Sequence, residues 1–246
     1  MDSLETELKR AQDLDESVLA DAIEQIGFEC TRCGACCKGY DPDEVDSTDA
    51  DTDSEREPHT ATVFPDEVRD LQDGGDYDWR DVARPMPYGL TEGKGGPEGE
   101  TFEWALQTDD CGDCTFYEES DDGTGHCGVH EDRPLICQTY PFSVALGGTS
   151  QPMGEAVDSV ALPAQREAGE TGDEEGMVRA HECEGLGRDI SREEAEELAG
   201  ALKQRAIREI REAIGVRDNY KPTDSQDVVV YDSEGPKTTD GRLIEE

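Results

Sequence analysis

The residues of this sequence that can do chemistry are its nine cysteines, which fall into two groups and one outlier. The first group has the pattern C-x2-C-x2-C-C and the second begins with C-x2-C. Ionised cysteines bind zinc and iron, so clustered cysteines indicate a metal site. The first group is Cys30, Cys33, Cys36 and Cys37, the second is Cys111, Cys114, Cys127 and Cys137, and the outlier is Cys183.

The spacing in the first group is that of bacterial ferredoxins, in which one loop offers three thiolates to an iron–sulfur cluster. Gly34 gives this loop a backbone without a Cβ, which suits a tight turn. Cys37 is expected to serve a second site or another role, because neighbouring side chains diverge in helices and strands. The C-x2-C pair of Cys111 and Cys114 is also a zinc spacing. The patterns therefore leave zinc and an iron–sulfur cluster both open.

Three thiolates from one loop leave a coordination position to be filled from elsewhere in the chain. The unused supply is the Cys114–Cys137 segment or Cys183. We therefore expect the first group to fold against that segment, with metal as a cross-link. Nine cysteines would allow two four-thiolate sites and one spare, and Cys111 is the candidate for the spare.

The expected compartment is the cytoplasm, because the first thirty residues lack a basic start, an apolar stretch and a small-residue cleavage site. Thiols stay reduced there, and an odd cysteine count also disfavours a disulfide framework. Buried thiols or scattered disulfides are the alternative reading. No apolar run approaches the roughly 20 residues of a membrane span, so no membrane partner is expected.

The composition is strongly acidic, with 62 Asp and Glu against 22 Lys and Arg and a net charge of −40. Leu, Ile, Val and Phe make up 41 of 246 residues, or 17%, so a large hydrophobic core is not expected. Phosphate backbones need basic surface, so nucleic acid is an unlikely partner and a protein partner stays open. Acid excess with only six lysines resembles the proteins of haloarchaea, and molar salt would screen its self-repulsion.

Helices are expected near both ends of the chain. Apolar residues at three- and four-residue steps predict one helix over 3–26, ended by Gly27. A capping box of Ser191 and Glu194 starts a second amphipathic helix that Gly215 ends. Its apolar stripe is Ala195, Leu198, Leu202, Ala206, Ile210 and Ile214.

Between these helices, short elements and loops are expected. A short helix begins at Pro65, and strands are predicted within 102–108 and 141–146. Residues 91–100 and 165–176 are expected to be loops. The segment 41–57 holds nine acids and one arginine, which predicts a solvated insertion.

The predicted fold class is small, loop-rich α+β, with terminal helices packed around a metal-pinned cysteine cluster. The expected divisions are an N-terminal helix at 1–26, a cysteine-cluster domain at 27–190 and a C-terminal helix at 191–215. An acidic tail at 216–246 is expected to be mostly disordered, although VVVY at 228–231 could dock as an edge strand.

The cysteine pattern, read with its neighbours, resembles the YkgJ-type cysteine-cluster family of zinc- or iron-chelating domains. The match runs over roughly 27–187 and includes FECTRCGACC, the Arg133-Pro134 and Pro141-Phe142 pairs, and a late Cys-x-Gly. It implies that the metal ligands are Cys30, Cys33, Cys36, Cys37, Cys114, Cys127, Cys137 and Cys183, with Cys111 as an addition. The pattern departs from the family at Glu184, which stands where proline is usual.

The four histidines and Arg133 have weaker claims to a role. His126 and His181 lie close to cysteines in sequence and could ligate, although the cysteine supply already suffices. His130 is expected to pack and His59 to be solvated. Arg133 could donate hydrogen bonds to a thiolate or carboxylate, or be a surface charge.

The function that these patterns favour is metal binding, through an iron–sulfur cluster or zinc, in a redox or metal-handling role. The alternative is an interaction module in which structural zinc holds a small fold without catalytic activity. A radical enzyme would need the C-x3-C-x2-C motif, which the sequence lacks. Whether the protein is an enzyme stays open.

Overall fold

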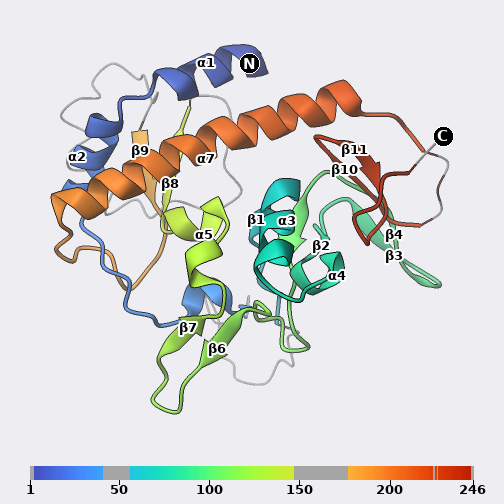
Figure 1. Cartoon of the computed structure of the whole chain (residues 1–246), viewed down its shortest axis with the longest axis horizontal. Coiled ribbons are helices and arrows are strands. Elements are labelled where there is room, and N and C mark those ends of the chain that lie inside the picture. Colours follow the sequence, from blue (N-terminus) through green and yellow to red (C-terminus); the bar gives the residue numbers. More distant parts are fainter. Residues whose placement is uncertain (1–2, 41–55, 147–176, 224, 226, 245–246) are drawn as a thin grey trace, which may run out of the picture. The chain divides into compact units, whose positions relative to one another are not determined.

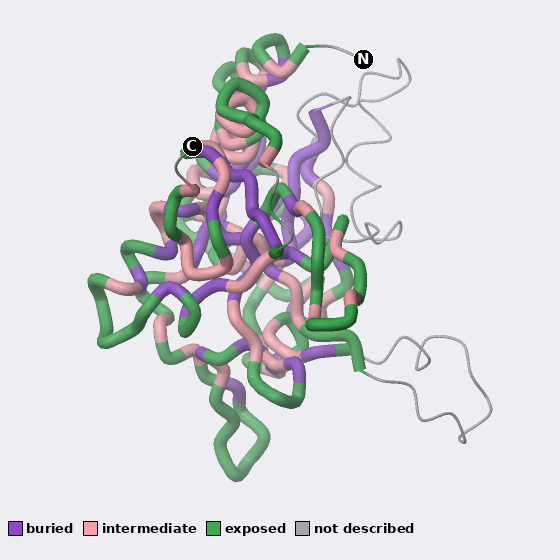
Figure 2. Tube along the Cα trace, turned by 90° about the vertical axis from the view of Figure 1, so that its right-hand side faces the viewer, coloured by how far each residue is buried: buried purple, intermediate pink, exposed green. Residues whose placement is uncertain are grey.

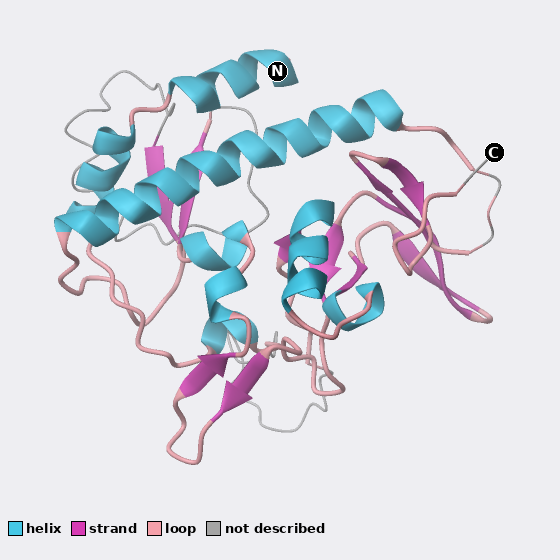
Figure 3. Cartoon of the chain, viewed as in Figure 1, coloured by secondary structure: helices cyan, strands magenta, loops and turns pink. Residues whose placement is uncertain are grey.

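The computed structural model describes residues 3–40, 56–146, 177–223, 225 and 227–244. The chain divides into two compact units, each built from separated stretches of sequence. Unit 1 comprises residues 1–31 and 135–218, and unit 2 comprises residues 32–134 and 219–246. Helices and short strands occur together throughout, so the predicted α+β class is confirmed (Figures 1 and 3).

Unit 1 packs helices on a two-stranded sheet. Its elements are α1 (Leu4–Asp13), α2 (Glu16–Ile26), α5 (Leu135–Thr139), β8 (Phe142–Ala145), β9 (Met177–Ala180) and α7 (Arg192–Asn219, whose last residue falls in unit 2). Strands β8 and β9 pair antiparallel, with Phe142 opposite Ala180. Apolar residues of α2, α7 and both strands form one continuous core; Figure 1 shows how the long helix α7 runs past α2, β8 and β9.

The N-terminal segment forms two helices where one was predicted. The Asp15 carboxylate accepts a hydrogen bond from the Ser17 backbone N–H (2.9 Å) and so starts α2. The chain before it leaves the helical region at Leu14. Gly27, at φ 77°, ends α2 as expected.

Helix α7 carries the predicted capping box and apolar stripe. Glu194 accepts from the backbone N–H of Ser191 (3.0 Å), and the Ser191 hydroxyl accepts from the Glu194 N–H (3.2 Å). The predicted end at Gly215 is wrong, because the helix continues to Asn219. Glycine weakens a helix by only about 1 kcal/mol, whereas Pro222 restricts the residue before it and so stops the helix.

Unit 2 is made of short helices and small sheets. Its helices are η1 (Ala35–Cys37), α3 (Pro65–Gly74), α4 (Trp79–Val82) and η2 (His130–Asp132). Three sheets have the strand orders β1-β5-β2, β11-β10-β4-β3 and β6-β7. The strands are β1 (Thr62–Val63), β2 (Ala83–Pro85), β3 (Leu90–Gly93), β4 (Gly96–Thr101), β5 (Trp104–Leu106), β6 (Tyr117–Glu119), β7 (Gly125–Cys127), β10 (Val229–Asp232) and β11 (Gly235–Lys237).

Helix α3 and strands β5 and β8 lie where the sequence predicted them, but two segments of unit 2 differ from the predictions. Residues 91–100 lie within the β3–β4 hairpin rather than a loop. The acidic tail contains β10 and β11, and β10 is an inner strand that pairs parallel with β4. All four residues of β10 are buried, because Val229, Val230 and Tyr231 place apolar area in the core of unit 2.

Strands β10 and β11 contribute a buried charged pair. Lys237 donates to Asp232 (2.7 Å), and both side chains are about 2% exposed or less. The indole N–H of Trp104 also donates to Asp232 (2.9 Å), while the Lys237 ammonium lies 5.2 Å from the centre of the Trp79 ring. Each charge is therefore satisfied by polar or aromatic partners, as a buried ion pair requires.

Most of the insertion at 41–57 and the loop at 165–176 lie outside the described residues. In the part of the chain that the structure describes, no helix is both long and apolar enough to cross a membrane.

Candidate metal centre

The segment 32–40 begins the site with a tight turn. Gly34 has φ 77°, and a Cβ there would overlap the Tyr117 hydroxyl, so the position requires glycine. The Cys37 N–H donates to the Gly34 carbonyl (2.8 Å) and closes η1. Glycine at position 34 therefore permits both the positive φ of the turn and the close approach of Tyr117.

Cys36 and Cys37 direct their sulfurs toward one another, and the two Sγ atoms are 3.8 Å apart. The expectation that neighbouring cysteines diverge is wrong here. It holds for a continuing helix or strand, but η1 ends at Cys37 and Lys38 is extended (φ −97°, ψ 150°). The two residues therefore do not belong to a continuing helix or strand, and their side chains can point toward one another.

The second cysteine group docks directly on this turn. The Cys114 N–H donates to the Cys37 carbonyl (2.8 Å), and the Gly125 N–H donates to the Arg32 carbonyl (2.7 Å). Tyr117 on β6 pairs with Cys127 on β7. The predicted folding of the first group against the Cys114–Cys137 segment is therefore confirmed for residues 32–40, while the metal cross-link stays a prediction.

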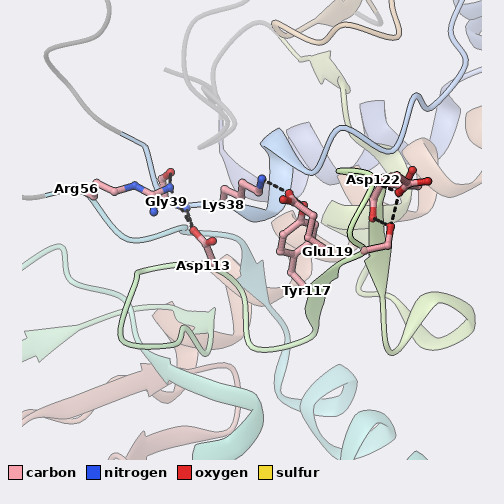
Figure 4. A network of polar contacts seen from close by, with 9 residues as sticks. Lys38, Gly39, Arg56, Asp113, Tyr117, Glu119 and Asp122 are labelled. Carbon is pink, nitrogen blue, oxygen red and sulfur yellow. Dashed lines mark hydrogen bonds and ion pairs between the residues drawn. The ribbon is translucent and has the colours of Figure 1, made fainter.

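Polar side chains hold these segments together (Figure 4). Asp113 accepts from the Gly39 N–H (2.8 Å) and from the Arg56 guanidinium (3.3 Å), and Arg56 also donates to the Gly39 carbonyl (2.5 Å). Lys38 forms an ion pair with Glu119, which also accepts from the Tyr117 hydroxyl (2.7 Å). Sequence reasoning missed these residues, since no local pattern distinguishes them from the many other charges.

The thiols of this cluster differ in their readiness to ionise. Hydrogen bonding from Cys37 lowers the pKa of Cys36 to about 7, and the nearby charge of Arg133 acts in the same direction. Burial, with smaller contributions from Cys127 and Cys36, raises the pKa of Cys114 to about 11. One exposed thiol is thus partly ionised at neutral pH, whereas the buried one is a neutral thiol until a cation stabilises its thiolate.

Arg133 lies close enough to Cys36 for its charge to lower the pKa of that thiol, which supports the prediction that Arg133 could donate to a thiolate. Its Nε donates to the His130 carbonyl (3.0 Å), which orients the guanidinium in unit 2.

His130 itself is exposed rather than packed, contrary to expectation. His59 is also misjudged: it is half-buried, and burial, followed by the charge of Arg84, lowers its pKa to about 4.

The donor set suits the metals that prefer thiolates. Cys36, Cys37, Cys114 and Cys127 supply four sulfurs from adjoining segments of unit 2. Zn–S bonds of about 2.3 Å in a tetrahedron place two sulfurs roughly 3.8 Å apart, the separation seen between Cys36 and Cys37. Among the described residues, however, no three His, Cys, Asp or Glu side chains already converge enough to hold a metal. Binding would therefore require side chains to close from these positions.

The other cysteines occupy different places. Cys33 is half-buried in unit 2, and Cys111 is exposed in a turn where its N–H donates to Asp109 (2.9 Å). Cys30, Cys137 and Cys183 belong to unit 1. All nine lie in the described part of the chain and carry thiols rather than disulfides.

His126 and His181 take no visible part in the four-sulfur set. His126 is exposed on β7. His181 belongs to unit 1, is buried, and lies 2.8 Å from the Ser143 hydroxyl through its Nε2. The hairpin between β6 and β7 has an exposed tip, seen at the bottom of Figure 2, so this edge of unit 2 faces solvent.

Comparison with known proteins places the pattern in a family. Neither the curated proteins nor the solved structures include a match to the chain. A family model named CxxCxxCC, described as "Putative zinc- or iron-chelating domain", matches residues 29–184, which is more than half of the sequence. With its cysteine cluster and this match over most of its length, the chain belongs to the CxxCxxCC family of zinc- or iron-chelating domains.

Proposed function

We propose that unit 2 binds one metal ion in a four-thiolate site formed by Cys36, Cys37, Cys114 and Cys127, and that the ion is zinc or a single iron. The observation that carries this proposal is the 3.8 Å separation of the Cys36 and Cys37 sulfurs, with the Cys114 backbone bonded to Cys37. Thiolates that bind separate irons of a cubane cluster lie farther apart than two thiolates on one ion. The geometry therefore favours a mononuclear site over the cubane iron–sulfur cluster that the spacing of the first group suggested.

The role that we propose is metal handling rather than a purely structural one. Cys36 is exposed and its thiol ionises near neutral pH, so it is suited to meet an incoming ion first. Cys114 is buried, and its thiol would lose its proton only when a cation binds to the sulfur. A site with one exposed ligand can exchange its metal with a partner, whereas an interaction module with structural zinc would enclose all four.

Metal analysis tests this proposal. The protein is purified without oxygen in high salt, and zinc, iron and acid-labile sulfide are measured per chain. We expect Cys114→Ser to remove about one equivalent of metal, and the matched variant Cys111→Ser to remove none. Sulfide equal to iron, with an absorption band near about 400 nm, would show a cluster and contradict the mononuclear site.

We also propose a reducing, high-salt setting such as a halophile cytoplasm, with a protein as the metal-exchange partner. Nine thiols require reducing conditions, and a net charge of −40 destabilises a compact chain unless salt screens it. The melting temperature should rise between about 0.1 M and several molar KCl, because the Debye length falls to about 3 Å at 1 M. A melting temperature that is flat or falling over this range would exclude the salt requirement.

A further inference from the structure

Arg84 of unit 2 is a cation without a carboxylate partner. Other arginines of unit 2 form ion pairs, such as Arg69 with Glu234 (2.6 Å) and Arg80 with Asp240 (3.6 Å). Among the described residues no Asp or Glu pairs with Arg84, although the sequence contains 62 acids. The missing partner is therefore a feature of this position rather than the result of a shortage of carboxylates.

The guanidinium of Arg84 is also incompletely hydrogen-bonded. Its Nη2 donates to the His59 carbonyl (2.8 Å), whereas its Nε is buried and has no acceptor within the described part of the chain. Burial lowers the pKa of Arg84, and no carboxylate acts in the opposite direction. A partly desolvated cation without a counter-ion destabilises a fold, and a bound anion would offset that cost.

The sheet β1-β5-β2 positions the Arg84 side chain. Arg84 lies opposite Ala105 on the central strand β5, and Ala105 lies opposite Thr62 on β1. Residues opposite one another in neighbouring strands share a face of the sheet, so the short side chain of Ala105 leaves room for the longer one to cross it. The guanidinium therefore reaches from β2 to the segment before β1, where His59 lies.

His59 supplies a second hydrogen-bond donor beside the guanidinium. Its backbone N–H donates to the Gly112 carbonyl (2.8 Å), and burial, followed by the charge of Arg84, lowers the pKa of its ring, so the ring is neutral and carries one N–H donor. His59 and Arg84 are both half-buried, so part of each residue stays open to solvent. Asp113, whose charge also acts on the ring, is already engaged by Arg56 (3.3 Å).

We infer that Arg84 and His59 bind a small carboxylate anion from outside the chain. Nη1 and Nη2 of the guanidinium keep further N–H donors, which suit the two oxygens of a planar carboxylate, and the imidazole N–H can donate to the same group. A carboxylate is favoured over phosphate, because the net charge of −40 repels a dianion more strongly than a monoanion. The inference is independent of the proposed metal site, since it uses none of the cysteines.

Titration of the full-length protein with acetate at neutral pH tests this site. Potassium acetate replaces potassium chloride at a constant molar potassium concentration, and NMR follows the ring signals of His59, assigned with His59→Gln. Acetate should shift these signals saturably and leave the exposed His126 ring unchanged. The shift should be at least several-fold smaller in Arg84→Gln, whereas Arg80→Gln, which removes an exposed, ion-paired arginine, should keep the wild-type response.

Circular dichroism checks that each variant folds. A response that does not saturate, that His126 shares, or that folded Arg84→Gln retains would overturn the carboxylate site. Phosphate titrated in the same way should give a weaker response than acetate, and a stronger response would contradict the assignment to carboxylates.

Arginine modification of the wild type gives a second measurement that needs no substitution. Phenylglyoxal reacts with accessible guanidinium groups, and peptide mass spectrometry compares labelling in potassium acetate with labelling in potassium chloride. Acetate should protect Arg84 at least several-fold and leave Arg80 equally labelled in both salts. Equal labelling of Arg84 in the two salts would exclude a bound carboxylate, and an Arg84 that is unreactive in both would show a guanidinium closed to ligands and also overturn the site.

Discussion

The two units bury different kinds of groups. Unit 1 joins its helices and sheet through one apolar cluster rich in alanine, including Ala195, Ala199 and Ala206 on α7, whose small side chains let helix and strands approach closely. Unit 2 has short strands, buries the Lys237–Asp232 ion pair beside two tryptophans, and depends on hydrogen bonds across its cysteine segments. Unit 2 also buries apolar side chains, among them Val68, Leu71 and Trp104, so the two units differ in the polar contacts that accompany the apolar core rather than in whether they have such a core.

Removal of the metal should produce the largest difference between the two units, because it should reduce hydrogen-exchange protection in unit 2 and not in unit 1. A structural zinc ion contributes on the order of 10 kcal/mol, and unit 2 would lose that contribution at the junction of residues 32–40 with 109–127. Hydrogen exchange at high salt, before and after chelation, should show loss of protection in these two segments. Protection of β8 and the middle of α7 should persist, because their contacts are apolar. Equal loss of protection in both units would contradict the distinction.

Asp232→Ala should produce the next largest effect. It removes the acceptor of the Trp104 indole and one of the two carboxylates that contact buried Lys237, the other being Glu234 (2.6 Å), which should lower the free energy of unfolding by about 3 kcal/mol. Both tryptophans of the chain lie in unit 2, so their fluorescence in urea reports on this unit alone.

The matched control is Arg80→Ala, which removes an exposed ion pair with Asp240 (3.6 Å). Its cost should stay below about 1 kcal/mol. Similar costs for the two variants would show that the buried pair does not stabilise unit 2.

Leu202→Ala tests unit 1 in the same way. Leu202 is fully buried in the apolar cluster, so its truncation should cost about 3 kcal/mol. Hydrogen exchange in α7 and β8 should accelerate while the tryptophan transition of unit 2 keeps its urea midpoint. Glu197→Ala, at an exposed position of the same helix, should change neither by more than about 0.5 kcal/mol. A shift of the tryptophan midpoint in Leu202→Ala would show that the units unfold together.

Acid should weaken unit 2 through His59. The folded protein lowers the pKa of this ring to about 4, chiefly by burial, so the unfolded chain binds the proton more readily. Stability from the neutral ring is complete above about pH 6.5 and declines toward pH 4, by at most about 1.4 kcal/mol per pH unit. Urea midpoints from tryptophan fluorescence should fall less steeply over this range in His59→Gln than in the wild type. His126→Gln, at an exposed ring, should keep the wild-type slope, and identical slopes for all three proteins would refute the role of His59.

Local patterns predicted the elements whose cause is local. The apolar stripe and the Ser191 capping box identified helix α7, and Pro65 identified the start of α3. The predictions missed or misjudged elements that depend on distant partners, and gave 228–231 at most an edge strand in a mostly disordered tail. Strand β10 pairs with β4, more than 120 residues earlier, and its short apolar run lies in a polar, acidic stretch that resembles a disordered tail. The glycines of 91–100 likewise concealed the β3–β4 hairpin.

The candidate site was predictable in its residue types and in the meeting of its two segments. The contact between Cys36 and Cys37 was not predictable, because it depends on a three-residue turn that follows Gly34 and is ended by the extended backbone of Lys38. The division of the cysteines between two units was also beyond sequence spacing, since Cys30 and Cys33 are three residues apart and belong to different units. The ligand roles of the eight family cysteines stay predictions.

The place of β10 within its sheet has a consequence for synthesis of the protein. The ribosome makes the cysteine segments of unit 2 about a hundred residues before it makes Val229–Asp232. Until then β4 lacks its inner neighbour, and Trp104 lacks the Asp232 carboxylate that accepts from its indole. The nascent chain therefore presents its thiols before the sheet of unit 2 is complete, and a nonsense codon between α7 and β10 would leave the cysteine segments in a unit that lacks β10 and β11.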